Sequence, residues 1–263
     1  MFPLYDENPT LRTPWITLAI IALNVFIFLG EFRLSPAKQQ SLVFQHGFVP
    51  ARLSQIESGE EIRIQTPQGQ IHTLNTGVTN VALTMLSTMF LHGGWMHLLG
   101  NMWFLWIFGN NVEDRIGHFR FGIFYLLSGF GATLCHWFTG TESLIPVIGA
   151  SGAIAGVLGA YAVTFPKAKV KTLVFLVVII TFIDLPALLV LGFWLLLQLL
   201  EASQSLHLNV DGGVAWWAHI GGFIIGAALI QLFKLGVPYP DGEATTFTNR
   251  RDPNISTSSW PPS

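Results

Sequence analysis

Long apolar runs separated by polar segments dominate the chain, and this pattern predicts helices that cross a membrane. A spanning helix needs about 20 mostly apolar residues, and fewer where Trp or other flanking groups anchor its ends. By this criterion we expect six spans, at about residues 15–29, 96–108, 119–138, 147–165, 185–201 and 214–235. The predicted fold class is all-α, a polytopic membrane protein formed by a six-transmembrane-helix bundle with a long first extracytoplasmic loop.

The polar segments divide the chain further. Residues 1–14 are predicted to form a cytoplasmic N-terminal segment and 15–235 the membrane domain. Within the first loop, 31–90, alternating residues flank a Pro/Gly turn, which predicts a β-hairpin over 61–74. The polar tail over 236–263 is rich in Pro, Ser and Thr, and we expect it to be cytoplasmic and disordered.

One apolar run, 172–200, is interrupted by the sequence Asp184-Leu185-Pro186. The residue before a proline is disfavoured in a helix, and an acidic side chain inside a bilayer is costly. We therefore expect an interfacial segment over 172–183 and a spanning helix from about residue 185, with Asp184 capping its start. A role for Asp184 in a proton or ion pathway is the alternative.

The distribution of lysine and arginine predicts the orientation in the membrane. If the N-terminus lies inside, the predicted inner segments contain most of the basic residues, namely Arg12, Arg115, Arg120, Lys167, Lys169, Lys171, Lys234, Arg250 and Arg251. The short outer loops at about 139–146 and 202–213 contain none. Because basic residues concentrate on the cytoplasmic side, both termini are predicted to be cytoplasmic.

Composition agrees with a protein whose surroundings are the lipid bilayer. The chain is 51% hydrophobic and 11% charged, whereas soluble domains carry about 25% charged residues. A net charge of −2 without a basic patch gives no reason to expect a nucleic-acid partner. No clear cleavage site follows the first apolar run and no transit-like segment precedes it, so we expect a retained first span in a prokaryotic cell (inner) membrane.

Polar side chains gather at one predicted depth. His92, His97 and Asn101 lie near the outer end of the second span. Ser151 and His219 lie near the outer ends of the fourth and sixth spans. With a rise of ~1.5 Å per residue, each lies within about the first two turns of its helix. Stray polar residues would scatter over both faces of the membrane, so this layer indicates a site.

Small residues surround these polar groups at helical spacing. The two rows are Ser151, Ala155 and Gly159 in the fourth span and Ala218, Gly222 and Gly226 in the sixth. Gly152-x-x-x-Gly156 is by itself typical of a helix-packing face, on which Ser151 is one more small residue. The same close approach would let a serine hydroxyl touch a histidine nitrogen. A serine nucleophile requires this contact because it is weak until an adjacent base takes its proton.

Each polar residue also has a plainer interpretation. His219 could fill a polar gap between helices, and Asn101 could bridge two of them. Alternatively, His97, Asn101 and the backbone N–H of Ser151 could donate hydrogen bonds to an oxyanion. His92 and His97 could bind a metal, but their spacing does not place them on one helix face and no carboxylate is near in the sequence. We therefore expect neither a metal nor a cofactor.

Taken in order, four segments resemble the motifs of the rhomboid intramembrane serine proteases. They are His92-Gly93-Gly94-Trp95-Met96-His97-Leu98-Leu99-Gly100-Asn101, Val112-Glu113-Asp114-Arg115-Ile116-Gly117, Gly149-Ala150-Ser151-Gly152 and Ala218-His219-Ile220-Gly221-Gly222. The resemblance covers about 15–235 and implies a six-helix, rhomboid-like bundle. It departs from some members at Ala155, where they carry an aromatic residue, and in 31–90, which lacks Trp.

The resemblance implies roles for individual residues. Ser151 would be the nucleophile and His219 its general base, with His97 and Asn101 stabilising the oxyanion. Structural and packing roles would fall to Gly149, Gly152, Gly156, Gly222, Gly226, Glu113 and Arg115. The partners would be single- or multi-span membrane protein substrates, which reach the site laterally near the fifth span and the loop at about 202–213. Pro186, Gly192 and Gly212-Gly213 are compatible with such movement.

Two other functions remain to be weighed against a serine endopeptidase. A catalytically silent rhomboid-like protein would bind membrane proteins without cleaving them, although such relatives usually lack the Ser or the His that this chain has. A transporter would have its site at the midplane and an inverted repeat. The polar layer lies at the outer third, and no such repeat is visible, which argues against a transporter.

Overall fold

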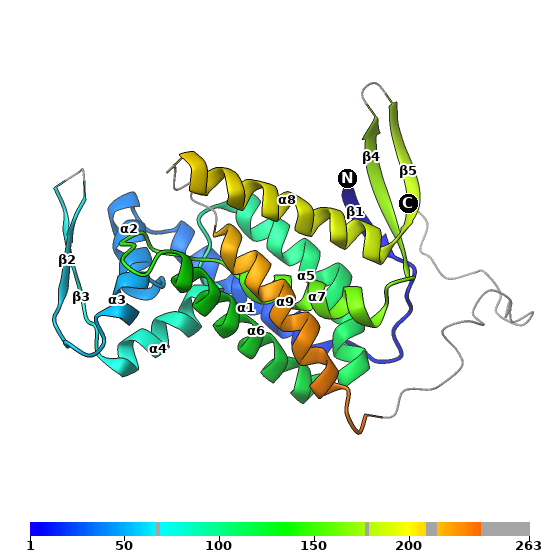
Figure 1. Cartoon of the computed structure of the whole chain (residues 1–263), viewed down its shortest axis with the longest axis horizontal. Helices are drawn as coiled ribbons and strands as arrows, with labels where there is room; N and C mark the ends of the chain where they lie inside the picture. Colours follow the sequence, from blue (N-terminus) through cyan, green and yellow to red (C-terminus); the bar gives the residue numbers. More distant parts are fainter. Residues whose placement is uncertain (67–68, 177–178, 209–214, 238–263) are drawn as a thin grey trace, which may run out of the picture.

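The computed structural model describes residues 1–66, 69–176, 179–208 and 215–237. Its main body is a bundle of helices, drawn in Figure 1: α1 (Trp15–Phe32), α5 (Trp95–Ile116), α6 (His118–Thr139), α7 (Ser151–Thr164), α8 (Ala187–Leu208) and α9 (Trp216–Phe233). Because α8 continues to Leu208, much of the predicted outer loop at 202–213 is helical. Gly212-Gly213 lie outside the described residues, as do all but the first two residues of the tail predicted to be disordered over 236–263.

The long first loop is folded into a small unit of its own at one end of the bundle (Figure 1). Its elements are α2 (Pro36–His46), α3 (Pro50–Ser54), β2 (Ile62–Gln65), β3 (Ile71–Leu74), α4 (Val78–Ser87) and the 3₁₀ turn η1 (Thr88–Phe90). The strands β2 and β3 pair antiparallel within 61–74, where alternation predicts a hairpin. The helices were not expected, and they bury Val49, Ala51, Ile62 and Leu74 in a separate small core.

A three-stranded antiparallel sheet stands at the other end of the bundle (Figure 1). It consists of β1 (Phe2–Asp6), β4 (Lys169–Leu176) and β5 (Ile179–Pro186), in the order β1-β4-β5. Thus the segment predicted to be interfacial forms a hairpin, and the N-terminal segment adds its edge strand. The expected capping role of Asp184 is wrong. Its carboxylate lies in β5 and binds Lys171 Nζ of β4 at 2.6 Å.

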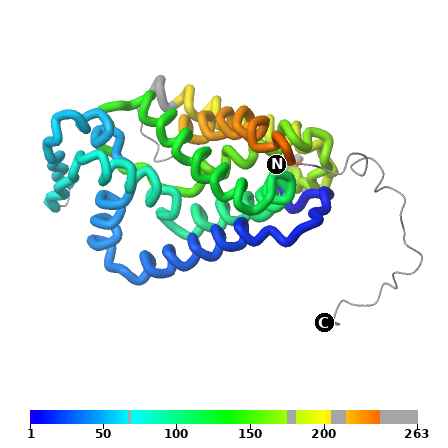
Figure 2. Tube along the Cα trace, turned by 90° about the horizontal axis from the view of Figure 1, so that it is seen from below, coloured from blue at the N-terminus to red at the C-terminus, as the bar shows by residue number. Residues whose placement is uncertain are grey.

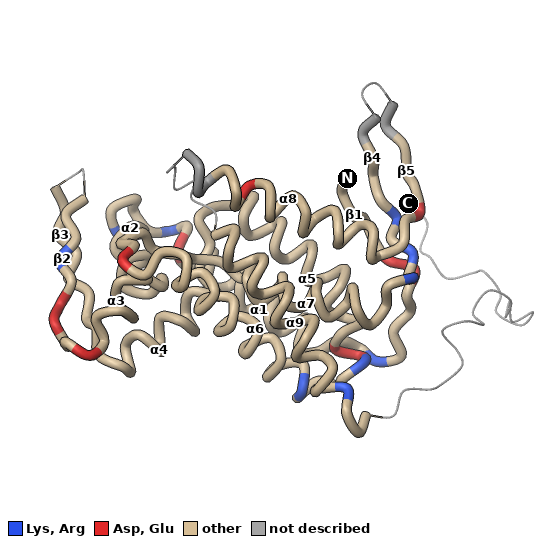
Figure 3. The backbone as a smooth tube through the Cα atoms, in the orientation of Figure 1, with Lys and Arg blue, Asp and Glu red and all other residues tan. Residues whose placement is uncertain are grey.

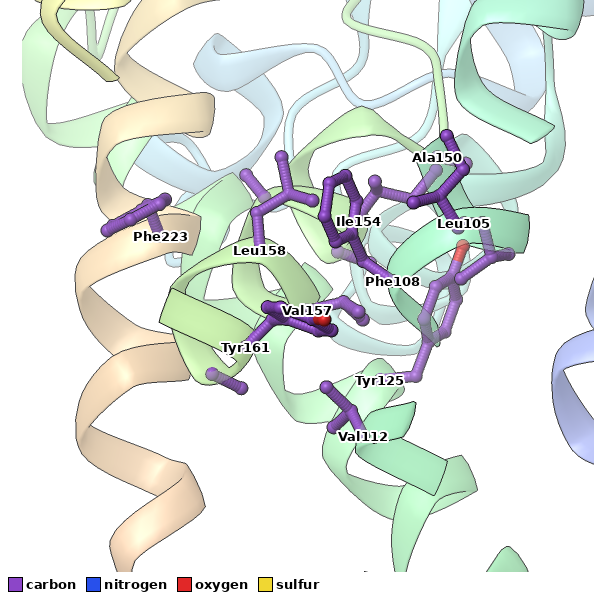
Figure 4. Close-up of a cluster of buried hydrophobic side chains, with 14 of the residues drawn as sticks. Leu105, Phe108, Val112, Tyr125, Ala150, Ile154, Val157, Leu158, Tyr161 and Phe223 are labelled. Atoms are coloured by element: carbon purple, nitrogen blue, oxygen red, sulfur yellow. The ribbon is translucent and has the colours of Figure 1, made fainter. Parts of the chain in front are cut away.

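The helix α7 lies at the centre of the bundle, and every residue from Ala153 to Ala162 is buried. Figure 2 shows α1 and α9 along opposite sides of the molecule with the green helices between them. A helix without a polar stripe must be covered on all sides, which is what this arrangement provides. Figure 4 shows its side chains Ile154, Val157, Leu158 and Tyr161 among Leu105, Phe108 and Val112 of α5, Tyr125 of α6 and Phe223 of α9.

Glycines bring the backbones of α7 and α9 into contact. A side chain on Gly226 of α9 would overlap the backbone of Gly156, and one on Gly222 would overlap Gly152 O. A side chain on Gly156 of α7 would overlap Ser128 of α6. The small-residue rows therefore form a packing interface, and that interface joins the helices that carry Ser151 and His219.

The charged segment 110–118, which separates the predicted spans 96–108 and 119–138, belongs mostly to α5. The turn itself is confined to Gly117, whose φ of +83° is a conformation that favours glycine, and α6 begins directly after it. Glu113 is fully buried and its carboxylate accepts the backbone N–H groups of Ile16 (2.9 Å) and Thr17 (2.7 Å) at the start of α1. It thereby satisfies donors that a helix start leaves unpaired. The side chain of Arg115 donates to the carbonyl oxygen of Val237 at 3.4 Å.

Among the described residues, four helices are long and apolar enough to cross a membrane: α1, α6, α8 over Ala187–Gln204, and α9. The helix α7 is apolar but shorter, and α5 carries charged residues in its last turns. Figure 3 shows the charged residues gathered toward the two ends of the bundle, with an uncharged band between them. A chain with this charge distribution is membrane-embedded.

Candidate active site

Ser151 and His219 are hydrogen-bonded to each other. Ser151 is the first residue of α7, and its Oγ donates to His219 Nε2 at 2.7 Å. His219 lies in the first turn of α9 and is 8% exposed. The pair is held by the glycine contacts between α7 and α9. Because a helix start presents unpaired backbone N–H groups, negative charge developing beside Ser151 would be stabilised there.

His97 lies against the same backbone as Ser151. A methyl group at Gly149 would lie 2.6 Å from His97 Nε2 and 3.6 Å from Ser151 Oγ, so both polar atoms border that position. Gly149 has a φ of +127° and donates its N–H to Thr88 O at 2.8 Å. The glycine therefore serves two purposes, since it allows the turn before α7 and leaves room for the imidazole of His97.

Asn101, two turns into α5, is oriented by a histidine that sequence reasoning left without a firm role. Its Nδ2 donates to His92 Nε2 at 3.0 Å, and both side chains are buried. The backbone N–H of His92 is in turn hydrogen-bonded to Glu31 Oε2 at 3.3 Å. An amide nitrogen carries two hydrogens, so Asn101 retains one N–H beside the cavity that contains Ser151.

The helix α8 adds two contacts to the site that the sequence did not suggest, and the first residue of α9 adds a third. Gln198 is 7% exposed, and its Oε1 accepts the Nδ1 hydrogen of His219 at 2.6 Å. Trp194, one turn earlier on the same helix, has its ring centroid 5.9 Å from that of His219. The ring of Trp216 meets the imidazole edge-on at 6.1 Å. The i, i+4 spacing of Trp194 and Gln198, with an amide inside an apolar run, is the signal that could have identified them.

A cavity of about 840 Å³ opens beside these groups. Its lining includes His97, Asn101, Ser151, Gln198 and His219, together with the apolar side chains Met96, Phe104, Ile148, Ile154, Leu158, Trp194 and Trp216. Such a mixture of apolar walls and a few convergent polar groups is typical of a site for a small or extended ligand. Within the described residues, no three His, Cys, Asp or Glu side chains come together in a way that could hold a metal ion.

Comparison with known proteins identifies the family. The model of the rhomboid domain matches residues 79–235. The chain belongs to the rhomboid family. Its relatives include RHOMBOID-like protein 4 of Arabidopsis thaliana, 28% identical over 228 residues (82% of this chain and 52% of the relative). Rhomboid-like protein 11, chloroplastic, of the same plant is 31% identical over 157 residues (57% and 51%). Rhomboid protein 1, mitochondrial, of Saccharomyces cerevisiae is 34% identical over 97 residues (35% and 28%).

The match defines the type of protein but not its cellular setting. This rhomboid spans about half the length of the first curated relatives it matches. Rhomboids as a family act on membrane proteins within the lipid bilayer, and they include both active proteases and catalytically inactive members. The names of several relatives refer to chloroplasts or mitochondria, so they give no support to the prediction of a prokaryotic cell membrane.

Proposed function

We propose that this rhomboid is an intramembrane serine endopeptidase that hydrolyses peptide bonds in or next to transmembrane segments of single- or multi-span membrane proteins. The observation that carries the proposal is the 2.7 Å hydrogen bond from Ser151 Oγ to His219 Nε2 at the edge of a cavity of about 840 Å³. A serine bonded to an unprotonated histidine nitrogen is arranged for nucleophilic attack. His97 and Asn101 border the same cavity, where they would act as oxyanion donors.

The reaction would proceed by acyl transfer. His219 Nε2 takes the hydroxyl proton while Ser151 Oγ bonds to the carbonyl carbon, and the resulting oxyanion is stabilised by His97, Asn101 and the Ser151 N–H. Collapse of this intermediate breaks the C–N bond, and His219 gives its proton to the leaving amine. His219 then takes a proton from a water molecule, and the water oxygen attacks the carbonyl carbon of the acyl-enzyme ester. Collapse of this second tetrahedral intermediate releases the carboxylic acid, and His219 returns the proton to Ser151 Oγ.

We further propose that α5 and α7 complete a six-span bundle with both termini in the cytoplasm. The helix α7, with 14 residues, is roughly 21 Å long, which is shorter than a hydrocarbon core of about 30 Å. Its burial among the other helices supports the proposal because neighbouring protein, rather than lipid, surrounds it from Ala153 to Ala162. The nucleophile at its first residue then lies below the outer membrane surface.

The test is cleavage of a single-span model substrate by the purified protein in detergent or liposomes. Ser151→Ala and His219→Ala are expected to lower kcat/KM at least about a thousand-fold. The matched controls Ser203→Ala and His46→Ala change exposed residues of the same types and should retain activity. A fluorophosphonate should label the wild type and not Ser151→Ala. A wild type that cleaves no member of a substrate panel better than Ser151→Ala would instead favour a silent, substrate-binding rhomboid.

A further inference from the structure

The contact between Gln198 and His219 determines which nitrogen of the imidazole carries the proton. A neutral imidazole has one N–H donor and one acceptor nitrogen. Gln198 Oε1 lies 2.6 Å from Nδ1, and an amide oxygen can only accept, so the hydrogen belongs on Nδ1. The lone pair is then on Nε2, the nitrogen that faces Ser151 Oγ. The opposite tautomer would place two acceptors against each other at Gln198.

The orientation of the ring is also controlled from α8. Trp194 and Gln198 are one helical turn apart and therefore lie on the same face of α8. The ring of Trp194 contacts the imidazole at an angle of 38°, and Gln198 binds its Nδ1. At position 155, where some rhomboids carry an aromatic residue, this chain has alanine, which cannot supply a ring contact to His219. The face of α8 that bears Trp194 and Gln198 thus supplies two of the contacts that keep the histidine turned toward Ser151, and Trp216 of α9 supplies another.

We propose that Gln198 is a positioning residue of the Ser151–His219 pair, which rests on the proposed function. Its amide oxygen selects the tautomer that can accept the serine proton. Once Nε2 is protonated, the imidazolium carries hydrogens on both nitrogens, and the Nδ1 hydrogen bond to Gln198 becomes charge-assisted and stronger. Gln198 takes up no proton itself, because an amide oxygen is not basic enough, so no charge leaves the pair.

The arrangement makes the contact between α8 and α9 a condition for turnover. The glycine interface of α7 and α9 holds Ser151 near His219 on its own. The helix α8 lies at the edge of the bundle (Figure 1). Its side chains Leu188, Leu189, Leu196 and Leu200 are exposed. If α8 moves outward, the serine and histidine stay together, but the base loses its partner on Nδ1.

The test compares acceptor-bearing and acceptor-free side chains of nearly equal size. Gln198→Met removes the acceptor and is expected to lower kcat about 10- to 100-fold, the effect of one hydrogen bond to a charged group, with KM within about twofold. Gln198→Glu keeps an acceptor oxygen and should recover most of kcat. Gln204→Met, at an exposed position on the same helix, is the matched control. Gln198→Leu is a second acceptor-free variant, to be used if the methionine variant does not fold.

The outcomes separate this inference from the proposed function. If the wild type outperforms Ser151→Ala, but a folded Gln198→Met or Gln198→Leu has a kcat within about twofold of the wild type, the positioning role is refuted. It is equally refuted if Gln198→Glu is no better than the acceptor-free variants, since a role in packing alone does not distinguish an oxygen from a thioether. If the wild type itself is no better than Ser151→Ala, the protease proposal fails first.

Discussion

Gly149 is the residue at which backbone geometry and the site meet most closely. Replacing it with alanine would place a methyl group 2.6 Å from His97 Nε2 at a φ of +127°. We expect Gly149→Ala to displace His97 and lower kcat about 100-fold, as loss of one oxyanion donor does. The backbone conformation would add a cost of about 1–2 kcal/mol to the free energy of unfolding. Substrate cleavage and thermal unfolding measure the two effects.

The control for this substitution is Gly140→Ala. Gly140 has a φ of −164°, which any residue adopts, and the nearest atom to an added methyl group would be Ser143 Cβ at 3.7 Å. Cleavage by this variant should match the wild type. If Gly149→Ala also retains full activity, His97 does not need to lie where the structure has it.

Asp6 makes the attachment of β1 dependent on pH. Burial raises the pKa of Asp6 from 3.8 to about 6 and outweighs the opposite effect of the hydrogen bond from Tyr161 OH at 2.5 Å. The folded state therefore binds the proton more tightly than the unfolded chain, and ionisation costs up to about 3 kcal/mol. The free energy of unfolding should fall as the pH rises from about 4 through 6.

Asp6→Asn removes this ionisation and retains an oxygen that can accept from Tyr161. We expect the variant and the wild type to unfold at similar temperatures near pH 4 and the variant to be the more stable above pH 6. Glu7→Gln, the exposed carboxyl next in the chain, controls for a general loss of negative charge. Parallel stability curves for Asp6→Asn and the wild type across this range would contradict the prediction.

At the scale of elements, the α7–α9 interface depends on the absence of side chains. Gly226→Ala would force a methyl group into the backbone of Gly156, and overpacking of this kind costs about 1–3 kcal/mol or more. We expect a lower unfolding temperature and weaker fluorophosphonate labelling of Ser151, because the helices that carry the pair must separate. A methyl group at Gly192 of α8 would have no atom within 4 Å, so Gly192→Ala should leave the unfolding temperature unchanged or raise it slightly. Equal unfolding temperatures for the two variants would show that α7 and α9 do not touch there.

Glu113 connects three helices from a fully buried position. Besides the start of α1, its carboxylate contacts His118 Nδ1 of α6 at 2.5 Å. Glu113→Gln replaces one acceptor oxygen with an NH₂ group that must face other donors. We expect the free energy of unfolding to fall by about 3–5 kcal/mol. Thermal unfolding of Glu113→Gln measures this loss, and Glu142→Gln, which changes an exposed carboxyl, is the control. A loss no larger than that of the control would mean that solvent, rather than Glu113, satisfies the start of α1.

At the scale of the whole molecule, hydropathy predicts where the helices are better than where they end. Each of the six apolar runs overlaps a bundle helix, but α5 extends through charged residues up to Ile116 because Glu113 is paired inside the bundle. The strands β4 and β5 were missed, since an apolar run does not distinguish a strand from a membrane segment. Ser151 and His219 could be singled out by depth, whereas Gln198 depends on how α8 is rotated against α9, which periodicity does not reveal.

The sheet and the bundle together predict which end of the molecule faces the cytoplasm. The strand β1 pairs with β4, so the N-terminus and the chain after α7 share one end, the end where Lys167, Lys169 and Lys171 lie. Ser151 starts α7 at the opposite end. Since short basic segments remain on the cytoplasmic side, the loop before Ser151 should face outward.

Cysteine labelling in intact cells tests this orientation. In a Cys135→Ser background, which removes the single native cysteine, Glu142→Cys is placed between α6 and α7 and Lys167→Cys between α7 and β4. Both native side chains are exposed. A membrane-impermeant maleimide should label Glu142→Cys directly and Lys167→Cys only after the membrane is permeabilised. The reverse pattern would invert the topology, and direct labelling of both would show that α7 does not cross the membrane.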